Sequence, residues 1–583
     1  MVMMRDGISL HTTIYEPVAD GSSHPVLMVR TPYSCSPYGE GFRSDLKESF
    51  SVYALNKYII VFQSVRGRYL SEGEYENVRP LPSLGTDGAA DTCCTSGRVQ
   101  TSGTAAKVPT DDATDTYDTV EWLLANTRNN GNVGVTGVSY PGYYATVAAL
   151  CGHPAIKAVS PQAPILDWYK GDDVHHNGAL MLLDTYYFGG SFFRPRGEPS
   201  TSMPKLKRAV EGSVYDWFLS RKTIPEITRT FPDSLPFWEQ ITLHPDYDAF
   251  WQERSLESRL KDVRPAVLVV GGTFDTDDCY GAVNTYRLIR EQSPRTELYF
   301  AYGPWYHGGW RDASYSRLGG AQFAQGLYDY YIYNVEYPFF RHYLEGEGDA
   351  PAAVSVAVSG TDRWETYDCW PPRRMRQTAV YLREGGSLST ALPNERQSFT
   401  EYVSDPASPV PFLERPEKRD RAYMAADQGF AREREDVLSF VMDVTDTLKL
   451  EGPVGVRLFV RTSSTDADFI VKLIDVAPDG SSMLLRGDVF RGKYRRSLSA
   501  PVPMRPGKIE EISFTMNDIA HHILPGHTLE VQVQSTWFPL VDLNPQTFVG
   551  NIYQAGEEDF RKATVKILHQ RAAASHLLLP VVD

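Results

Sequence analysis

Long apolar runs are missing from this 583-residue sequence, and none approaches the length that a membrane-spanning helix needs. Basic residues are also in deficit: 58 Lys and Arg face 73 Asp and Glu, and the net charge of −15 argues against a nucleic-acid partner. The remaining composition, 42% hydrophobic and 22% charged, is typical of a globular protein. A chain of this length predicts roughly two to four domains.

Cysteine and histidine form no metal or disulfide pattern. The six cysteines lack metal-site spacing, and a disulfide between neighbouring cysteines would be strained. They are Cys35, Cys93, Cys94, Cys151, Cys279 and Cys369. His175-His176 has no third ligand spaced nearby. We therefore expect no metal and no cofactor, and the cysteine usage weakly favours a reducing compartment.

The most informative segment is Gly137-Val138-Ser139-Tyr140-Pro141-Gly142. An apolar run with turn signals, 132–136, precedes it and a run of small residues, 143–150, follows it. This order predicts strand, tight turn and helix with Ser139 at the apex, which is typical of the nucleophile elbow of α/β-hydrolases. The strict pattern is Gly-x-Ser-x-Gly, and here the second glycine comes one place later. A plain structural turn is the alternative interpretation.

Two further strand ends complete a candidate catalytic triad. In this fold the nucleophile is followed along the chain by Asp or Glu and then by His, each at the carboxyl end of a strand. The buried-strand run 265–270 leads to Asp275, and the strand 298–302 leads to His307. Ser139, Asp275 and His307 are therefore expected at one edge of the sheet. His307 would accept the serine proton, and Asp275 would orient the imidazole.

An oxyanion hole must accompany such a triad. The backbone amide of Tyr140, directly after the nucleophile, supplies one donor. The second donor in this fold comes from the loop after an early strand, and here the strand 25–30 leads into Tyr33. The Tyr33 hydroxyl could replace a second amide. Taken alone, however, Tyr33 would be interpreted as an ordinary loop tyrosine.

Four motifs in register resemble the cocaine esterase and X-prolyl dipeptidyl peptidase superfamily. They are Arg30-Thr31-Pro32-Tyr33, Arg66-Gly67-x-x-x-Ser71-x-Gly73, Gly137-Val138-Ser139-Tyr140-x-Gly142 and Gly303-Pro304-Trp305-x-His307. The similarity runs nearly end to end, and within the superfamily the chain looks most like the α-amino-acid ester hydrolases and glutaryl-cephalosporin acylases. The resemblance implies that the Tyr33 hydroxyl and the Tyr140 amide form the oxyanion hole.

The resemblance also implies a pocket for the α-ammonium group of a substrate. The α-amino-acid ester hydrolases carry a carboxylate cluster there, whose members would fall on Asp173, Asp277 and Asp278. The first of the two downstream acids is usually Glu, so Asp277 is a shortened version. Clustered carboxylates raise one another's pKa values unless a cation lies among them. Without the resemblance, these acids would be interpreted as helix caps or surface residues.

A second departure from the family lies in Gln63-Ser64-Val65-Arg66-Gly67, where Asp usually stands in place of Ser64. By the resemblance, Arg66 holds a structural rather than a catalytic position. The change removes an expected partner of Arg66, so we expect lower local stability and unaltered chemistry.

The predicted architecture is an α/β-hydrolase domain with an inserted helical cap and a C-terminal β-sandwich. Residues 1–165 and 262–345 supply the catalytic domain, and residues 166–261, with helix-like stretches between Pro and Gly breaks, supply the cap. Beyond the Gly-rich linker 345–349 the hydrophobic period becomes two, which predicts a β domain over 346–583. The resemblance implies a jelly roll there.

Two segments near the predicted site have no assigned chemistry. Residues 84–110 are rich in Ser, Thr, Gly and Ala and cannot bury an apolar face, so we expect a long mobile insertion near the mouth of the sheet. Aromatic residues of the cap could line an acyl pocket or form the core of the cap. They are Trp168, Tyr169, Tyr186, Tyr187, Phe188, Phe192 and Phe193.

We therefore expect a serine hydrolase that cleaves, and can transfer, acyl groups of α-amino-acid esters and β-lactam amides through an acyl-enzyme on Ser139. The alternatives are a general carboxylesterase or glutaryl-type acylase without an amine requirement, an X-prolyl dipeptidyl peptidase, and a non-catalytic binding module. The expected partner is a small-molecule substrate, with no nucleic acid and no membrane, and we expect a homo-oligomer. No signal peptide is visible, so the expected compartment is the cytoplasm, or the periplasm or exterior if a leader has been removed.

Overall fold

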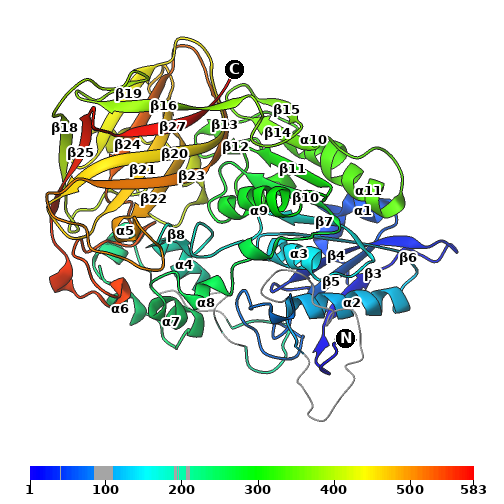
Figure 1. The fold of residues 1–583 in the computed structure, drawn as a ribbon. Helices are drawn as coiled ribbons and strands as arrows, with labels where there is room; N and C mark the ends of the chain where they lie inside the picture. The colour runs from blue at the N-terminus through cyan, green and yellow to red at the C-terminus, as the bar shows by residue number, and fades with distance from the viewer. Residues whose placement is uncertain (40, 85–108, 190–193, 195, 205–209) are drawn as a thin grey trace.

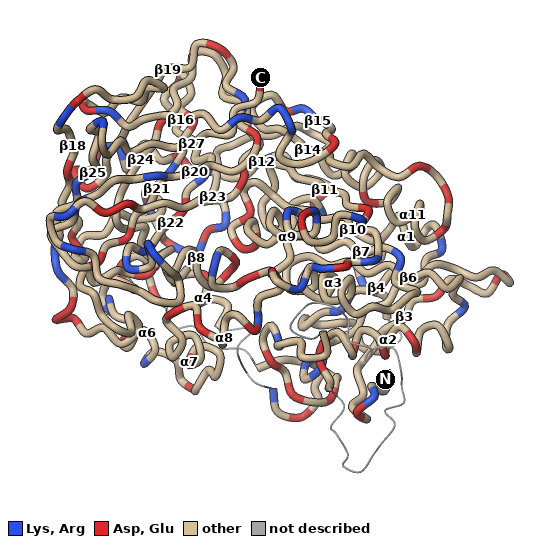
Figure 2. The backbone as a smooth tube through the Cα atoms, viewed as in Figure 1, with Lys and Arg blue, Asp and Glu red and all other residues tan. Residues whose placement is uncertain are grey.

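The computed structural model describes the chain except for residues 40, 85–108, 190–193, 195 and 205–209 (Figure 1). Most of the predicted insertion 84–110, together with Cys93, Cys94, Phe192 and Phe193, therefore lies outside the described residues. Among the described helices, none is both long and apolar enough to cross a membrane. Acidic and basic residues are interspersed over both domains (Figure 2).

A nine-stranded sheet forms the centre of the catalytic domain, in the order β15-β14-β11-β10-β7-β6-β4-β5-β3. Neighbours from β5 to β14 are parallel, and the edge strands β3 (Thr12–Tyr15) and β15 (Arg363–Tyr367) run antiparallel. The parallel strands are β4 (His24–Thr31), β5 (Ile59–Ser64), β6 (Asn129–Val138), β7 (Ile156–Gln162), β10 (Ala266–Gly272), β11 (Leu298–Gly303) and β14 (Val354–Val358). Most of them are continuous apolar runs because helices bury both faces.

Helices cover the two faces of this sheet. Glycines of β6 show which helix faces which side: a Cβ on Gly134 would lie 2.7 Å from Leu344 of α11, whereas a Cβ on Gly137 would lie 2.4 Å from the backbone of Pro141 in α3. Successive residues of a strand point to opposite faces of the sheet, so Gly134 and Gly137, three residues apart, face opposite sides. Helices α11 (Tyr337–Glu345) and α3 (Tyr140–Leu150) therefore pack on opposite faces. The other helices of this domain are α1 (Ser51–Leu55), α2 (Asp112–Asn126), α9 (Cys279–Gln292) and α10 (Leu327–Tyr331).

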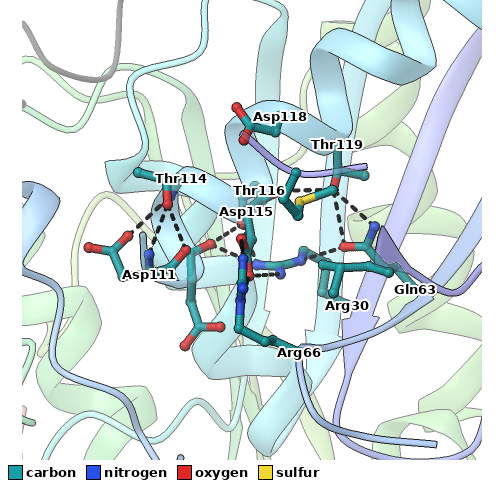
Figure 3. A network of polar contacts seen from close by, with 12 residues as sticks. Arg30, Gln63, Arg66, Asp111, Thr114, Asp115, Thr116, Asp118 and Thr119 are labelled. Atoms are coloured by element: carbon teal, nitrogen blue, oxygen red, sulfur yellow. Dashed lines mark hydrogen bonds and ion pairs between the residues drawn. The ribbon is translucent and has the colours of Figure 1, made fainter. Parts of the chain in front are cut away.

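A buried polar network ties α2 to the sheet (Figure 3). Arg30 of β4 donates to Gln63 of β5 at 2.9 Å and to the Thr116 hydroxyl of α2 at 2.6 Å. Arg66, just after β5, donates to both carboxylate oxygens of Asp115 at 3.0 and 2.7 Å. It also donates to Asp6 at 2.8 Å. Arg66 is therefore paired with two carboxylates although position 64 carries a serine.

The cap is built of short helices interrupted by turns. They are α4 (Leu182–Gly189), α5 (Val214–Leu219), α6 (Ile224–Thr228), α7 (Pro236–Leu243) and α8 (Ala249–Gln252). Helices α5 to α8 lie beneath the C-terminal domain in Figure 1, and the Tyr215 hydroxyl of α5 donates to the Pro409 carbonyl at 2.7 Å. The cap therefore packs against the β domain as well as against the catalytic domain.

Two strands beyond the boundary predicted at 345/346 still belong to the catalytic sheet. Gly346 ends α11 in the left-handed conformation, as a linker glycine would, but the chain then returns to the catalytic sheet. Strand β14 pairs in parallel with β11, and β15 pairs with β14. The hydrolase sheet therefore continues to Tyr367, because an exposed β11 edge would otherwise leave backbone groups unpaired.

The C-terminal domain is a mainly antiparallel β structure, with β17 and β19 paired in parallel, and it folds around its own core, which includes Leu458, Val471 and Ile512. Its strands are β16 (Met375–Arg383), β17 (Ser387–Ser389), β18 (Phe399–Ser404), β19 (Leu438–Asp443), β20 (Leu448–Thr462), β21 (Asp468–Val476), β22 (Ser482–Arg491), β23 (Glu510–Ile523), β24 (Thr528–Gln534), β25 (Ala563–Gln570), β26 (Ala573–Ala574) and β27 (His576–Val582). The predicted fold class, an α/β-hydrolase domain followed by a strand-rich domain, is confirmed.

Candidate active site

Ser139 stands on a strained turn between β6 and α3. Its backbone φ of 70° and ψ of −128° are rare for a residue other than glycine. A Cβ on Gly137 would lie 2.4 Å from the Pro141 carbonyl oxygen, and a Cβ on Gly142 would lie 2.6 Å from the Gln162 carbonyl oxygen of β7. Both glycines are therefore required by close backbone approach, and this includes the second glycine, which comes one place later than in the strict motif.

Asp275 and His307 meet at the carboxyl ends of β10 and β11. Nδ1 of His307 lies 3.0 Å from each carboxylate oxygen of Asp275. The backbone amides of Asp277 and Asp278 donate to Asp275 Oδ1 at 2.8 and 3.0 Å, which holds that carboxylate in place. The loop carrying His307 is anchored in turn, because Trp310 Nε1 donates to Gln162 at 2.7 Å.

Ser139 comes to the same edge of the sheet, but Asp278 stands beside it. Ser139 Oγ lies 3.5 Å from Asp278 Oδ2, and the same oxygen lies 4.0 Å from Nε2 of His307. Ser139 and His307 are both described residues that line one cavity, and no direct hydrogen bond joins them. The Ser139 hydroxyl donates to Asp278 in this arrangement, and this hydrogen bond must be given up before the serine proton can pass to His307.

Two donors surround Ser139 where an oxyanion would form. Tyr33, just after β4, lines the cavity and makes a side-chain hydrogen bond with Ser139. Burial, reinforced by the Asp173 carboxylate, raises the pKa of Tyr33 well above its usual value, so the phenol keeps its proton and can donate. Helix α3 begins at Tyr140, directly after the serine, so the Tyr140 amide lies at the positive N-terminal end of this helix.

Asp173 and Asp278 form an acidic pair next to the serine. Asp173 accepts from Trp168 Nε1 at 2.9 Å, and Asp278 Oδ1 is buried without a hydrogen-bond partner among the described residues. Burial, and then the charge of Asp277, raise the pKa of Asp173 to about 7. Burial, and then the charges of Asp173 and Asp172, raise the pKa of Asp278 well above its usual range. A cation between the two acids would relieve both effects.

Asp277 is in a different situation, because arginines of the C-terminal domain already pair with it. Arg421 Nη2 lies 3.1 Å from its Oδ2, and Arg419 Nη2 lies 3.4 Å from its Oδ1. Burial opposes ionisation, but His307 and the two arginines outweigh it and lower the pKa of Asp277. The three predicted acids thus separate into Asp277, which two arginines pair with, and the pair Asp173 and Asp278, whose cationic neighbour among the described residues is His307, with Nε2 4.0 Å from Asp278 Oδ2.

The carboxylates also act on His307. Burial disfavours the imidazolium, but Asp275 and Asp277 outweigh that penalty and raise the pKa of His307 to about 9. At neutral pH His307 is therefore protonated, and it must lose charge before it can accept a proton from Ser139.

A cavity of about 260 Å³ is lined by Ser139, Tyr33 and His307, together with Asp173 and Asp277. Its walls include two of the predicted cap aromatics, Trp168 and Phe188, and the apolar residues Ile165 and Val174. Tyr169 and Tyr186 are instead buried in the core. The cavity is thus apolar along one wall and charged at Asp173, Asp277, His307 and Arg421, which suits a small organic ion.

Comparisons with known proteins identify the family of this chain. Residues 6–309 match the family model described as X-Pro dipeptidyl-peptidase (S15 family), and residues 347–578 match the X-Pro dipeptidyl-peptidase C-terminal non-catalytic domain. The cocaine esterase of Rhodococcus sp. (strain MB1 Bresler) is 30% identical over 100% of this chain and 98% of that protein. The chain belongs to the S15 family. It is a serine hydrolase, and the predicted superfamily resemblance is confirmed.

Two solved structures resemble this S15-family chain over its whole length. An α-amino acid ester hydrolase has 34% identity and a TM-score of 0.89, covering 100% of this chain and 95% of that one. An aminopeptidase from a marine sediment archaeon, Thaumarchaeota archaeon, has 33% identity and a TM-score of 0.89, covering 100% and 96%.

Several residues of this S15-family site were not found from the sequence. Asp172 accepts hydrogen bonds from the amides of Leu166 and Gly281 at 2.8 and 2.7 Å. It thereby joins the start of the cap, at Leu166, to helix α9. Arg419 and Arg421 come from a charged segment that carries no recognisable sequence motif.

His175 and His176, considered above as metal ligands, contact Tyr553 at 2.6 Å and Asp488 at 3.0 Å respectively. The described residues hold no cluster suited to a metal ion.

Proposed function

We propose that this serine hydrolase removes α-amino-acyl groups from esters and amides, β-lactam amides included, through an acyl-enzyme on Ser139. The main support for this proposal is the position of the Asp278 carboxylate. Its Oδ2 lies 3.5 Å from Ser139 Oγ, and its Oδ1 is buried without a hydrogen-bond partner among the described residues. In an α-amino-acyl substrate the ammonium group is attached to the carbon next to the scissile carbonyl. When Ser139 attacks that carbonyl, the ammonium group would lie against the Asp278 carboxylate. Asp173 supplies the second carboxylate.

In the proposed mechanism, Ser139 Oγ attacks the substrate carbonyl while His307 Nε2 takes its proton, and Asp275 stabilises the resulting imidazolium. The Tyr33 hydroxyl and the Tyr140 amide donate to the oxyanion. Collapse of the tetrahedral intermediate expels the leaving group, which takes the proton from His307. Water, activated by the same imidazole, then releases the amino acid; an amine nucleophile in place of water gives acyl transfer.

The energetics favour selection of an amine. A carboxylate and an ammonium about 4 Å apart, at an effective dielectric of about 20, attract by roughly 4 kcal/mol before desolvation. Because Arg419 and Arg421 neutralise Asp277, we assign the ammonium to Asp173 and Asp278 alone. A neutral acyl group would bring no positive charge to these two buried acids. An acyl group with its own carboxylate, such as glutaryl, would be repelled.

The relatives support this class of reaction, since two full-length structural neighbours carry the names α-amino acid ester hydrolase and aminopeptidase. The S15 family description favours X-Pro dipeptidyl peptidase activity as the second candidate. That reaction also needs a free substrate amine, so the acidic pair does not distinguish the two. Release of the chromophore from an Xaa-Pro anilide would support it.

The deciding experiment compares phenylglycine methyl ester with phenylacetate methyl ester, which lacks only the amine. We expect kcat/KM to be at least about tenfold higher for the amino ester at neutral pH. Equal values would overturn the amine requirement and favour a general esterase. Labelling of Ser139 by a fluorophosphonate, with the Ser139→Ala variant as the blank, shows separately whether the nucleophile is active.

A further inference from the structure

One wall of the active-site cavity comes from the C-terminal domain. Arg421 lines the cavity and begins the short 3-10 helix η6 (Arg421–Ala425). The Asp420 side chain accepts from the Ala422 amide at 2.8 Å and caps this helix. Tyr423 and Met424 of the same helix are buried. The backbone that carries Arg421 is thus held in place. The C-terminal domain therefore contributes a residue to the active-site cavity, although the matching family model is described as a non-catalytic domain.

The guanidinium of Arg421 is only partly used by the protein. Its side chain is 42% exposed, and its recorded partner within the described chain is Asp277, 3.1 Å away. Arg419 differs, because it pairs with both Asp184 and Asp277 and is 17% exposed. A guanidinium carries several N–H donors in a planar fork that fits a carboxylate. Arg421 therefore retains donors that face the cavity.

Arg421 lines the same cavity as Ser139 and His307, close to the imidazole nitrogen that serves the leaving group. Asp277 Oδ2, which pairs with Arg421, is also 4.0 Å from Nε2 of His307. Nε2 is the atom that returns the proton to the leaving group. Under the proposed function the acyl amine pairs with Asp173 and Asp278, so the guanidinium in the same cavity is left for the other part of the substrate, the leaving group.

We infer that Arg421 binds a carboxylate carried by the leaving group, so that the site prefers substrates with an amine at one end and an acid at the other. Peptides with a free carboxyl terminus and β-lactam nuclei have this chemistry. This inference rests on the proposed function and adds a second recognition element to it. The opposite charges of the two ends of the cavity align such a substrate, because reversed binding would bring its carboxylate to Asp173 and Asp278.

The test uses two esters of phenylglycine that differ only in the leaving alcohol: glycolate, which carries a carboxylate, and glycolamide, which is neutral. For the native enzyme we expect kcat/KM for the glycolate ester to exceed that for the glycolamide ester by about tenfold to a hundredfold. In Arg421→Gln this ratio should fall to near one. Arg421→Lys keeps the charge but not the fork, and should retain part of the preference.

Arg415→Gln is the matched control, because Arg415 is an exposed arginine of the same loop and does not line the cavity. It should leave the ratio unaltered. A native ratio near one, or an unaltered ratio in Arg421→Gln, would overturn the inference. The acyl part is the same in both esters, so the ratio is independent of the amine requirement. Failure of the proposed function would appear elsewhere, as equal rates for phenylglycine and phenylacetate methyl esters.

Discussion

The Asp278 carboxylate lies against the Ser139 hydroxyl, with Oδ2 3.5 Å from Oγ. The same oxygen is 4.0 Å from Nε2 of His307, so the acid lies close to both the candidate nucleophile and its base. An ammonium bound there would hold the carboxylate and free the serine hydroxyl to turn toward the imidazole. Substrate recognition and activation of the nucleophile are thus linked through one side chain.

The first prediction concerns Asp278→Asn, which keeps the shape and removes the charge. We expect kcat/KM for phenylglycine methyl ester to fall by about tenfold to a hundredfold, the cost of losing a charged hydrogen bond. The value for phenylacetate methyl ester should fall much less, so the amino-to-desamino ratio should collapse. Asp312→Asn removes one carboxylate from the His307 loop without altering the cavity lining, and it should preserve the ratio. Parallel losses on both substrates would contradict the assignment.

The second prediction concerns pH. Asp275 and Asp277 raise the pKa of His307 to about 9 despite burial, and only the neutral imidazole accepts a proton. For phenylacetate methyl ester, kcat/KM should therefore rise with pH and level off above about 9. A bound ammonium adds positive charge beside the imidazole and lowers its pKa, so the midpoint of kcat for phenylglycine methyl ester should lie below that value.

The amino ester should also show a descending limb in kcat/KM. Its amine loses its proton with a pKa of roughly 8, and the neutral amine no longer pairs with Asp173 and Asp278. The neutral ester has no such group and should show no descending limb in the same range. Steady-state rates between pH 5 and roughly 10 measure both limbs. The rising limb of kcat for the amino ester and that of kcat/KM for the neutral ester should therefore have different pH midpoints. Equal midpoints would disprove the effect of the bound ammonium on the pKa of His307.

Much of the catalytic edge could be predicted from the sequence because local patterns determine it. The apolar runs before Ser139, Asp275 and His307 form β6, β10 and β11, and parallel strands bring their carboxyl ends together. The strained turn at Ser139 could be predicted as well, since Gly137 permits a close approach that no side chain would allow.

The parts that were missed depend on contacts between distant segments. Arg419 meets Asp277 across 142 positions, and a charged segment before η6 carries no signal that it reaches a cavity in another domain. Strand β14 follows a true linker, so composition could not show that the chain returns to the first sheet. Likewise, Asp115 becomes a partner of Arg66 only when α2 packs on the sheet.

The third prediction concerns the oxyanion hole. Tyr33→Phe removes one donor from the cavity and should lower kcat by roughly 10²–10³, with little change in KM, because the hydrogen bond strengthens only as the oxyanion forms. Tyr75→Phe is a suitable control, since the Tyr75 hydroxyl contacts Asn77 at 3.2 Å rather than the serine. Stopped-flow kinetics with phenylglycine methyl ester would measure acylation directly. An undiminished acylation rate would assign the second donor to another group.

The last prediction concerns stability and the two carboxylates that hold Arg66. Asp115 has a side chain only 2% exposed and binds the guanidinium through both oxygens, whereas Asp6 is 26% exposed. Removing one member of a buried ion pair strands the other charge, so Asp115→Asn should lower the free energy of unfolding by about 3–5 kcal/mol. Asp6→Asn should cost about 1 kcal/mol or less, because water compensates an exposed partner. Urea unfolding of both variants measures the difference, and equal losses would mean that burial does not set the strength of this pair.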